Sequence, residues 1–124
     1  LAHTRLSILD LNHSADQPMF NSDGSICIVF NGEIYNYKDL EQNSKNDTEA
    51  LAKGLKNEGW EFLKKCDGMF ALAFYNKTTK ELILARDTNG TKPLYYGYIK
   101  DKLYFSSDFG ISSIFSCNSI VRVF

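Results

Sequence analysis

Apolar and polar positions follow one another along the chain in blocks that predict strands separated by short turns. Ser25–Phe30 is almost continuously apolar, which is typical of a strand buried on both faces. Asn31 and Gly32 come next, and this dipeptide is expected to end the strand. Met69–Tyr75 and Glu81–Arg86 predict two further strands joined by a polar turn.

Three more segments have strand character. Arg5–Leu11 is apolar and compatible with a strand. Lys92–Ile99 and Leu103–Ser106 predict a hairpin around a short charged turn. Because short connections can join only antiparallel neighbours, the sheets are expected to be antiparallel.

The clearest helix is expected over Asn46–Gly59. Asn46 and Glu49 have the spacing of a capping box, and acidic residues occupy the first turn. Leu51 and Leu55 fall on one face of this helix, four residues apart.

A second, shorter helix is predicted over Trp60–Lys65, with Trp60 and Leu63 facing inward, and Phe109–Phe115 is a candidate for a third. The pattern amounts to about six strands and two or three helices. The predicted fold class is therefore α+β with antiparallel sheets, not a doubly wound parallel sheet.

Composition narrows the class of protein. The chain has 124 residues, 44% of them apolar and 23% charged, which suits one globular domain or part of one. Its net charge of −1 offers no basic field for nucleic acid or an anionic membrane, and no apolar run is long enough for a membrane span. The first residue is not Met, so a piece of a longer chain is expected.

The cysteines and histidines argue against a metal or disulfide framework. Cys27, Cys66 and Cys117 form no CxxC pair, and His3 and His13 have no matched carboxylate spacing. Cys27 lies in an apolar run and is interpreted as a core residue. This cysteine usage fits a reducing compartment.

Several polar residues at strand or helix ends have two interpretations each. Asn31 and Gly32 could aim a side-chain amide and a backbone N–H at one oxyanion, although a turn without chemistry is the commoner use of Asn-Gly. Arg5 could bind a carboxylate or lie at the surface. Asp47 could bind an ammonium group or cap a helix.

The pair Arg86 and Asp87 is interpreted as an internal ion pair with a structural role.

Taken together, the polar blocks are more specific than any one of them. They are His3–Leu11, Gln17–Met19, Phe30–Tyr37, Asp47–Glu49, Asp67–Ala71, Ala85–Asp87 and, after Gly90, Lys92–Tyr96. In this order they resemble the glutaminase domain of glutamine-dependent asparagine synthetases, a class II glutamine amidotransferase with an N-terminal nucleophile. The resemblance covers roughly residues 2–108.

The resemblance implies a four-layer αββα sandwich of antiparallel sheets, as in N-terminal-nucleophile hydrolases, here incomplete at the N-terminus. It implies hydrolysis of glutamine to glutamate and ammonia by an N-terminal Cys whose own α-amino group is the base. Such an amine titrates near pH ~8 and can accept a thiol proton. The Cys block that opens the family pattern is absent from the chain, and neither Cys27, Cys66 nor Cys117 matches it.

The resemblance also assigns the pocket. Arg5 would bind the α-carboxylate of glutamine and Asp47 its α-ammonium, while Asn31 and the Gly32 N–H would form the oxyanion hole. The remaining pocket residues are implied to be Leu6, Ile8 and Glu33.

On this interpretation residues 1–124 are a partial glutaminase domain without its C-terminal synthetase domain. The domain itself would need no cofactor and no metal; ATP and Mg would serve the missing domain, which would use the ammonia to amidate aspartate. The implied partners are glutamine and that synthetase domain in cis, in a cytoplasmic enzyme, and a homodimer is left open.

The chain departs from the family pattern in two further places. The stretch from Tyr37 to Asp47 is shorter than the family's usual stretch, and Asp108–Ile111 differs from the sequence block that the family has at this place. Two alternatives therefore stay open. One is a non-catalytic module with the same fold, and the other is an amidotransferase branch that modifies amino sugars or polysaccharides.

Overall fold

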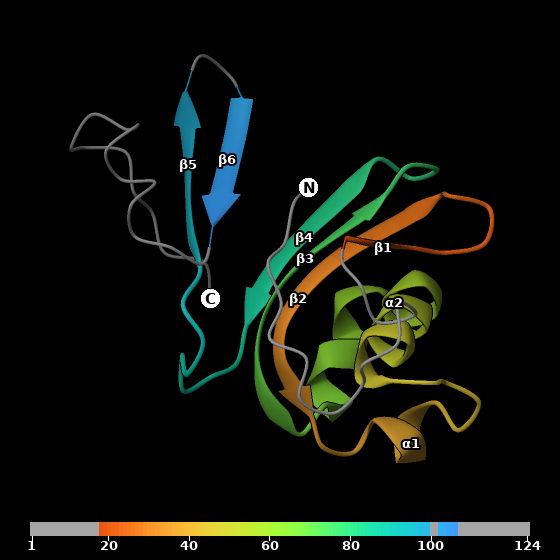
Figure 1. The fold of residues 1–124 in the computed structure, drawn as a ribbon. Helices are drawn as coiled ribbons and strands as arrows, with labels where there is room; N and C mark the ends of the chain where they lie inside the picture. Colours follow the sequence, from red (N-terminus) through yellow and green to blue (C-terminus); the bar gives the residue numbers. More distant parts are fainter. Residues whose placement is uncertain (1–17, 100–101, 107–124) are drawn as a thin grey trace.

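A four-stranded antiparallel sheet forms the centre of the molecule (Figure 1). The computed structural model describes residues 18–99 and 102–106. The strands are adjacent in chain order: β1 (Met19–Phe20), β2 (Ile26–Ile34), β3 (Gly68–Asn76) and β4 (Glu81–Arg86). β2 and β3 pair along nine residues each, from Ile26 opposite Asn76 to Ile34 opposite Gly68.

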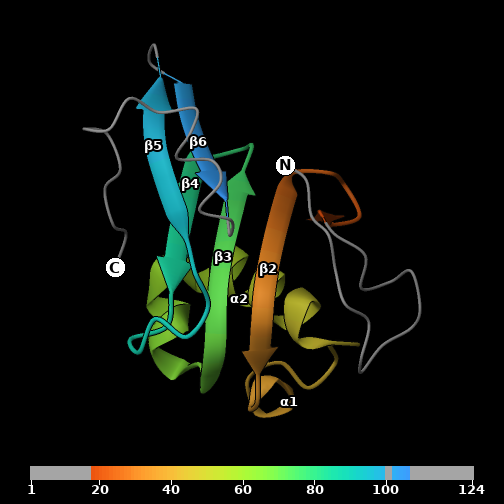
Figure 2. The same ribbon diagram turned by 60° about the vertical axis from the view of Figure 1, so that its left-hand side comes forward.

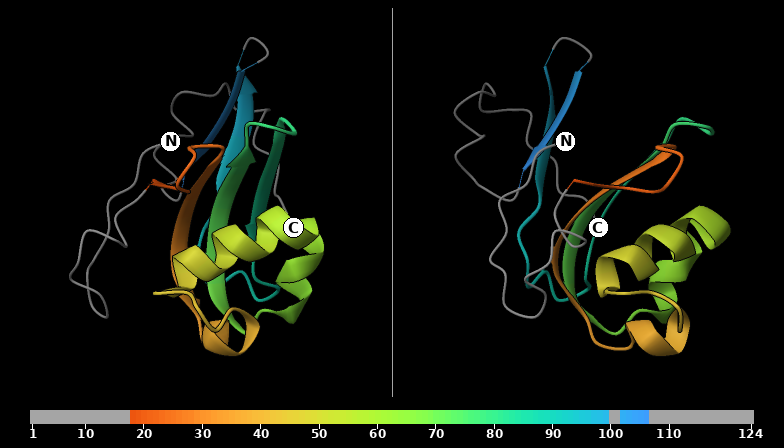
Figure 3. Two further views of the ribbon diagram at one scale, coloured as in Figure 1. Left: turned by 90° about the vertical axis from the view of Figure 1, so that its right-hand side faces the viewer. Right: turned by 45° about the vertical axis from the view of Figure 1, so that its right-hand side comes forward.

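The helices cover one face of this sheet (Figure 3). They are α1 (Tyr37–Leu40), α2 (Asp47–Glu58) and the 3-10 helix η2 (Gly59–Lys65). The core lies between the two layers, where alternate residues of β2 and β3 meet the apolar face of α2. Its largest buried side chains are Ile26, Ile28, Leu51, Leu55, Leu72 and Phe74.

A hairpin of β5 (Tyr95–Ile99) and β6 (Lys102–Ser106) lies on the other side of the sheet (Figure 2). The described residues thus form a helix layer, a four-stranded sheet and a two-stranded sheet in succession. This confirms the α+β class with antiparallel pairing and agrees with three layers of an αββα sandwich.

The start of α2 follows the predicted capping pattern. The Asn46 side chain accepts a hydrogen bond from Glu49 N–H at 2.9 Å, and the Glu49 carboxylate accepts one from Lys45 N–H at 2.7 Å. The reciprocal bond thus goes to the residue before the cap rather than to Asn46 itself. A cap of this kind stabilises a helix by about 1 kcal/mol.

The predicted end of β2 is wrong. The strand does not stop at Asn31 and Gly32 but continues to Ile34, opposite the first residues of β3. Gly32 has a φ of +138°, and a Cβ at this position would collide with the carbonyl oxygen of Met69. Glycine is therefore needed for close approach of two strands, not for a turn.

The orientation predicted for η2 is also wrong in one residue. Trp60 is 55% exposed, and Lys64 lies 4.6 Å from the centre of its ring. Phe62 is the buried residue instead, and it packs on Gly54 of α2. Leu63 packs against the core as predicted.

Smaller differences complete the comparison with the expected elements. The strand β1 and the short helix α1 have no counterpart in the predicted pattern, and β5 begins at Tyr95 rather than Lys92. The expected strand Arg5–Leu11 and helix Phe109–Phe115 lie outside the described residues. In the described part of the chain, no helix has the length and apolar character to span a membrane.

Candidate active site

The last residues of β2 carry the polar side chains of the candidate site. Ile28, Phe30 and Ile34 turn inward to the helix layer, where all three are buried. Because side chains alternate between faces along a strand, Asn31 and Glu33 lie on the opposite face. Both are half-buried, so this end of β2 places an amide and a carboxylate on one surface.

The register of the sheet also fixes the direction of the Gly32 N–H. Tyr35 N–H donates to the carbonyl oxygen of Asp67 at 2.7 Å, and hydrogen-bonded and non-hydrogen-bonded pairs alternate in an antiparallel ladder. Gly32 and Ile34 therefore occupy non-hydrogen-bonded positions, and their N–H groups point away from β3. At this edge Ile34 N–H meets the carboxylate of Asp47.

Asp47 is the first residue of α2, and its side chain reaches back to the end of β2. Its Oδ2 accepts a hydrogen bond from Ile34 N–H at 3.1 Å. The fold thus brings together residues that are thirteen positions apart in the sequence. This contact places the Asp47 carboxylate beside the last residues of β2, and its role in binding an ammonium group stays a prediction.

Burial raises the pKa of Asp47 above the ordinary 3.8, and the nearby negative charge of Glu33 raises it further. Hydrogen bonds from backbone N–H groups, that of Ile34 foremost, oppose this rise. A half-buried carboxylate beside a second carboxylate is a favourable place for a cationic group, because an ammonium would relieve both desolvation and repulsion.

A row of residues crosses the sheet beside this site. Asn31 lies opposite Ala71, which lies opposite Arg86 on β4. The guanidinium group of Arg86 packs against Gly90, where a Cβ would collide with it. Among the ion pairs of the described residues, none joins Arg86 to Asp87, so the predicted internal pair is wrong.

Asp87 instead holds the backbone. Its carboxylate accepts hydrogen bonds from Phe70 N–H and Asn89 N–H, each at 3.0 Å, and from Thr91 N–H at 3.3 Å. Burial pushes the pKa of Asp87 upward, but these bonds outweigh it and the pKa lies below the ordinary 3.8. Since Phe70 lies opposite Gly32, Asp87 supports the strand that faces the site. The structural role predicted for this region is correct, by a different contact.

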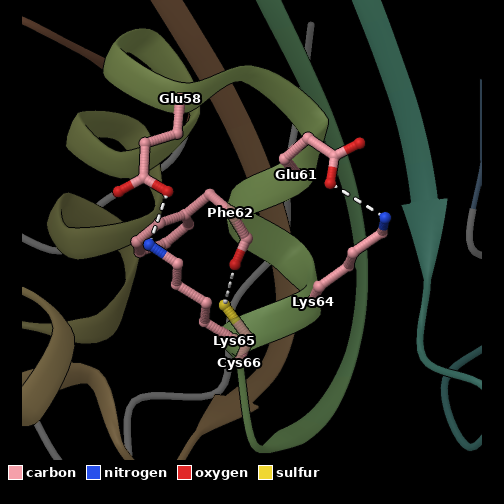
Figure 4. A network of polar contacts seen from close by, with 6 residues as sticks. All are labelled: Glu58, Glu61, Phe62, Lys64, Lys65 and Cys66. Carbon is pink, nitrogen blue, oxygen red and sulfur yellow. Dashed lines mark hydrogen bonds and ion pairs between the residues drawn. The ribbon is translucent and has the colours of Figure 1, made fainter.

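The two described cysteines are poor nucleophiles. Cys27 is buried in β2, as predicted, and its burial raises the pKa of its thiol. Burial raises the pKa of Cys66 to about 11. Its Sγ lies 3.6 Å from the carbonyl oxygen of Phe62, to which it donates a weak hydrogen bond (Figure 4). A thiolate is the reactive form, so neither residue fits nucleophilic catalysis near neutral pH.

This protection predicts slow alkylation. At pH 8 a thiol with a pKa of about 11 is ionised in roughly one molecule per thousand, against about a quarter for a free cysteine. We expect iodoacetamide to modify Cys66 at least about 100 times more slowly in the folded protein than in urea. Peptide mapping by mass spectrometry measures the rate at each cysteine separately. Equal folded and unfolded rates would contradict the burial described here.

The other predicted pocket residues, Arg5, Leu6 and Ile8, lie outside the described residues, and their roles stay predictions. Within residues 18–99 and 102–106, no three His, Cys, Asp or Glu side chains come together as metal ligands.

Comparison with known proteins places this chain in a family. The family model described as a glutamine amidotransferase domain matches residues 1–119. The chain is 41% identical over 122 residues to asparagine synthetase (glutamine-hydrolysing) 2 of Bacillus subtilis, covering 93% of this chain and 16% of that protein. It is 41% identical over 116 residues to asparagine synthetase (glutamine-hydrolysing) 3 of Arabidopsis thaliana, covering 87% of this chain and 20% of that protein.

The fold has a counterpart among solved structures. The glutamine phosphoribosylpyrophosphate amidotransferase of B. subtilis, solved with ADP and GMP, superposes with a TM-score of 0.63 at 28% sequence identity. The match covers 83% of this chain and 26% of that one. The chain therefore spans only a minor part of the proteins it matches.

Proposed function

The chain belongs to the glutamine amidotransferase domain family, and on that premise we propose that it hydrolyses glutamine to glutamate and ammonia. The observation that carries the proposal is the arrangement at the end of β2. There the Asn31 side chain lies on the face turned away from the helices, and the Gly32 N–H points to the same edge of β2 at which Ile34 N–H donates to the Asp47 carboxylate. An amide substrate needs two donors for its oxyanion, and an amino acid substrate needs an anion for its ammonium group.

The proposed reaction begins with attack of a cysteine thiolate on the side-chain amide carbon of glutamine. The N-terminal cysteine that the family resemblance implies would be this nucleophile, because burial makes Cys27 and Cys66 unsuitable. The Asn31 amide and the Gly32 N–H would donate to the oxyanion of the tetrahedral intermediate. Ammonia then leaves with a proton from the α-amino base, and water hydrolyses the thioester to glutamate.

Substrate choice would come from the two ends of the amino acid. Asp47, with Glu33 nearby, would hold the α-ammonium, and Arg5 would bind the α-carboxylate bidentately. Leu6 and Ile8 would complete the pocket through their backbone groups. A simple amide without these charges would leave Asp47 buried without a cation, which costs binding free energy.

The use of the ammonia is a second part of the proposal. The relatives named asparagine synthetases are about five to six times longer than the matched region, since it covers 16–20% of them. We take the ATP- and Mg-dependent amidation of aspartate to belong to a separate domain in cis. This domain would itself need no cofactor, and we propose a cytoplasmic location for the enzyme.

Two measurements test the proposed function. Intact mass and N-terminal fragmentation of the protein purified from its natural source should show a chain longer than 124 residues that begins with Cys. That protein should release ammonia from glutamine. A mature protein without this cysteine, or one that leaves glutamine unchanged, would favour the non-catalytic alternative.

The raised pKa of Asp47 predicts a pH dependence of KM. Only the carboxylate attracts the α-ammonium, so KM for glutamine should rise with falling pH, beginning above the 3.8 of an ordinary Asp. Asp47→Asn should raise KM about 10- to 100-fold at neutral pH and abolish this acid limb. Steady-state kinetics between pH 4 and 8 measure both effects, in roughly half-unit steps.

Glu49→Gln is the matched control, because Glu49 lies in the same turn of α2 but bonds to Lys45 N–H and Lys53. It should leave KM and its pH profile unchanged. The pH dependence of folding stability due to Asp47 has the opposite sign to the pH dependence of substrate binding. Because the folded state raises the pKa of Asp47, its ionisation costs folding free energy as the pH rises through this range. An Asp47→Asn variant with unchanged KM would refute the assigned role.

A further inference from the structure

The side chain of Asn36 does not cap the helix that it precedes. It is the N-cap residue of α1, where an Asn side chain normally accepts a hydrogen bond from the helix, but it makes no such bond. Its Nδ2 donates to the carbonyl oxygen of Lys65 at 2.9 Å, and its Oδ1 accepts from Asp67 N–H at 2.8 Å. The side chain therefore joins segments about thirty residues apart in the sequence.

These contacts prolong the pairing of β2 with β3. The last strand pair is Ile34 opposite Gly68, and beyond it Tyr35 N–H donates to Asp67 at 2.7 Å. The Asn36 amide then takes the place of one more peptide group, with one donor and one acceptor on the opposite segment. The β2 end is thus held two residues past the last strand pair.

The opposite segment makes contacts of its own with α2 and within η2 (Figure 4). Lys65 Nζ lies 2.8 Å from Glu58 Oε2 at the end of α2, and Cys66 N–H donates to the Leu63 carbonyl at 3.2 Å. Phe62 is buried against Gly54 of α2. Asn36 therefore ties the end of β2 to the helix layer and not to an isolated loop.

This attachment bears on the candidate site through Ile34. On one side the backbone of Glu33 touches Gly68 so closely that a Cβ there would collide with the Glu33 carbonyl oxygen. On the other side Ile34 N–H donates to Asp47 Oδ2. Asn36 lies two residues after Ile34, so its contacts hold the strand end that follows the N–H group bonded to Asp47.

We propose that Asn36 is a positioning residue for the α-ammonium subsite of glutamine, acting through Ile34 N–H on the carboxylate of Asp47. This inference rests on the proposed function and adds a residue that touches no substrate. Its effect should fall on substrate binding, because Ile34 forms the last strand pair, two residues from Asn36, whereas the oxyanion donors Asn31 and Gly32 lie further inside the paired part of β2.

The test compares Asn36→Ala with Asn21→Ala in the native full-length protein. Asn21 lies before the start of β2 and makes two side-chain bonds of the same kind, accepting from Ile26 N–H at 2.9 Å and donating to Ser25 Oγ at 3.0 Å. We expect Asn36→Ala to raise KM for glutamine about tenfold with kcat within about twofold. Asn21→Ala should leave both values unchanged.

A double-mutant cycle shows whether Asn36 acts through Asp47. If it does, Asn36→Ala should raise KM about tenfold in the wild-type background but less than about twofold when Asp47→Asn is already present. If the Asn36→Ala protein does not fold, Asn36→Asp keeps the acceptor for Asp67 N–H and replaces the donor to Lys65 with a carboxylate oxygen, which the Lys65 carbonyl repels. The same pattern of KM values is expected for it.

The outcomes separate this inference from the proposed function. If wild-type protein does not hydrolyse glutamine, the proposed function fails and the inference fails with it. If wild-type protein is active but Asn36 variants match Asn21→Ala, only the inference is overturned. An equal rise in KM with and without Asp47→Asn also overturns it, because the effect would then arise elsewhere.

Discussion

Replacement of Asn31 by alanine is expected to lower kcat for glutamine hydrolysis by about two to three powers of ten, the usual effect of losing one oxyanion donor. KM should change by no more than about threefold, because this hydrogen bond forms fully only in the transition state. The half-buried amide lies at the end of β2 beside Gly32, whose N–H would supply the second donor. Steady-state ammonia release by the native full-length protein measures both constants.

Val29→Ala is the matched control for this experiment. Val29 lies on the same strand and the same face, two residues before Asn31, and it pairs with Ala73 across the sheet. Its truncation should cost about 1 kcal/mol of stability through lost packing and leave kcat unchanged. If the two variants have the same kcat, Asn31 is a structural residue of β2 and not an oxyanion donor.

The longer strands and the long helix could be predicted because local signals agreed with the fold. Ile26–Phe30 contains most of the buried residues of β2, and Asn46 caps α2 with Leu51 and Leu55 in the core. In these elements the apolar period, the cap and the tertiary packing all favour the same structure. The sequence pattern alone was therefore sufficient for their type and approximate limits.

The end of β2 could not be predicted because a tertiary contact outweighs the local signal. Asn31 and Gly32 favour a turn in isolation, yet pairing with β3 keeps them extended. That pairing needs Gly32 against Met69 and Gly68 against Glu33, two close approaches between distant segments. No local pattern shows that Gly32 of β2 and Gly68 of β3, which are far apart in the chain, allow the same two strands to approach closely.

The exposed Trp60 illustrates a different failure. Trp60 and Leu63 are three residues apart, so they lie on the same side of a 3-10 helix, yet only Leu63 packs against the core. Phe62 fills the space beside Gly54 of α2 instead, and Lys64 lies over the Trp60 ring. Size and hydrophobicity alone favoured the wrong aromatic residue.

The candidate site was only partly accessible from the sequence. Period two places Asn31 and Glu33 on one face, but the contact of Asp47 with Ile34 depends on how α2 crosses the sheet. Only the family resemblance associated Asp47 with the end of β2 at the level of sequence. The support by Asn36 was missed and the contacts of Asp87 were predicted wrongly, because the partners of both side chains are backbone groups, which carry no residue-specific signal.

Replacement of Gly32 by alanine is expected to have the largest effect on stability. Its φ of +138° is a conformation that L side chains rarely adopt, and the new Cβ would collide with backbone atoms of Met69 and Phe70. Backbone strain of this kind costs about 1–3 kcal/mol, and overpacking adds about as much. Because domains are stable by only about 5–15 kcal/mol, β2 and β3 should open far more often. Hydrogen exchange of their amides, followed by mass spectrometry in the full-length protein, measures this local free energy.

Gly24→Ala is the control that separates the two causes of the expected loss of stability, the collision of the new Cβ and the strain of a positive φ. Gly24 has a φ of +72°, but nothing lies within 4 Å of where its Cβ would be. Its replacement should therefore cost only about 1–2 kcal/mol, the penalty for a left-handed residue, and leave glutamine hydrolysis intact. Gly32→Ala should lower protection across β2 and β3 by several kcal/mol and abolish hydrolysis, since the Gly32 N–H would move with the strand. Equal loss of protection in the two variants would mean that β2 and β3 do not approach closely at Gly32. Full protection with lost activity would instead assign Gly32 to the oxyanion hole alone.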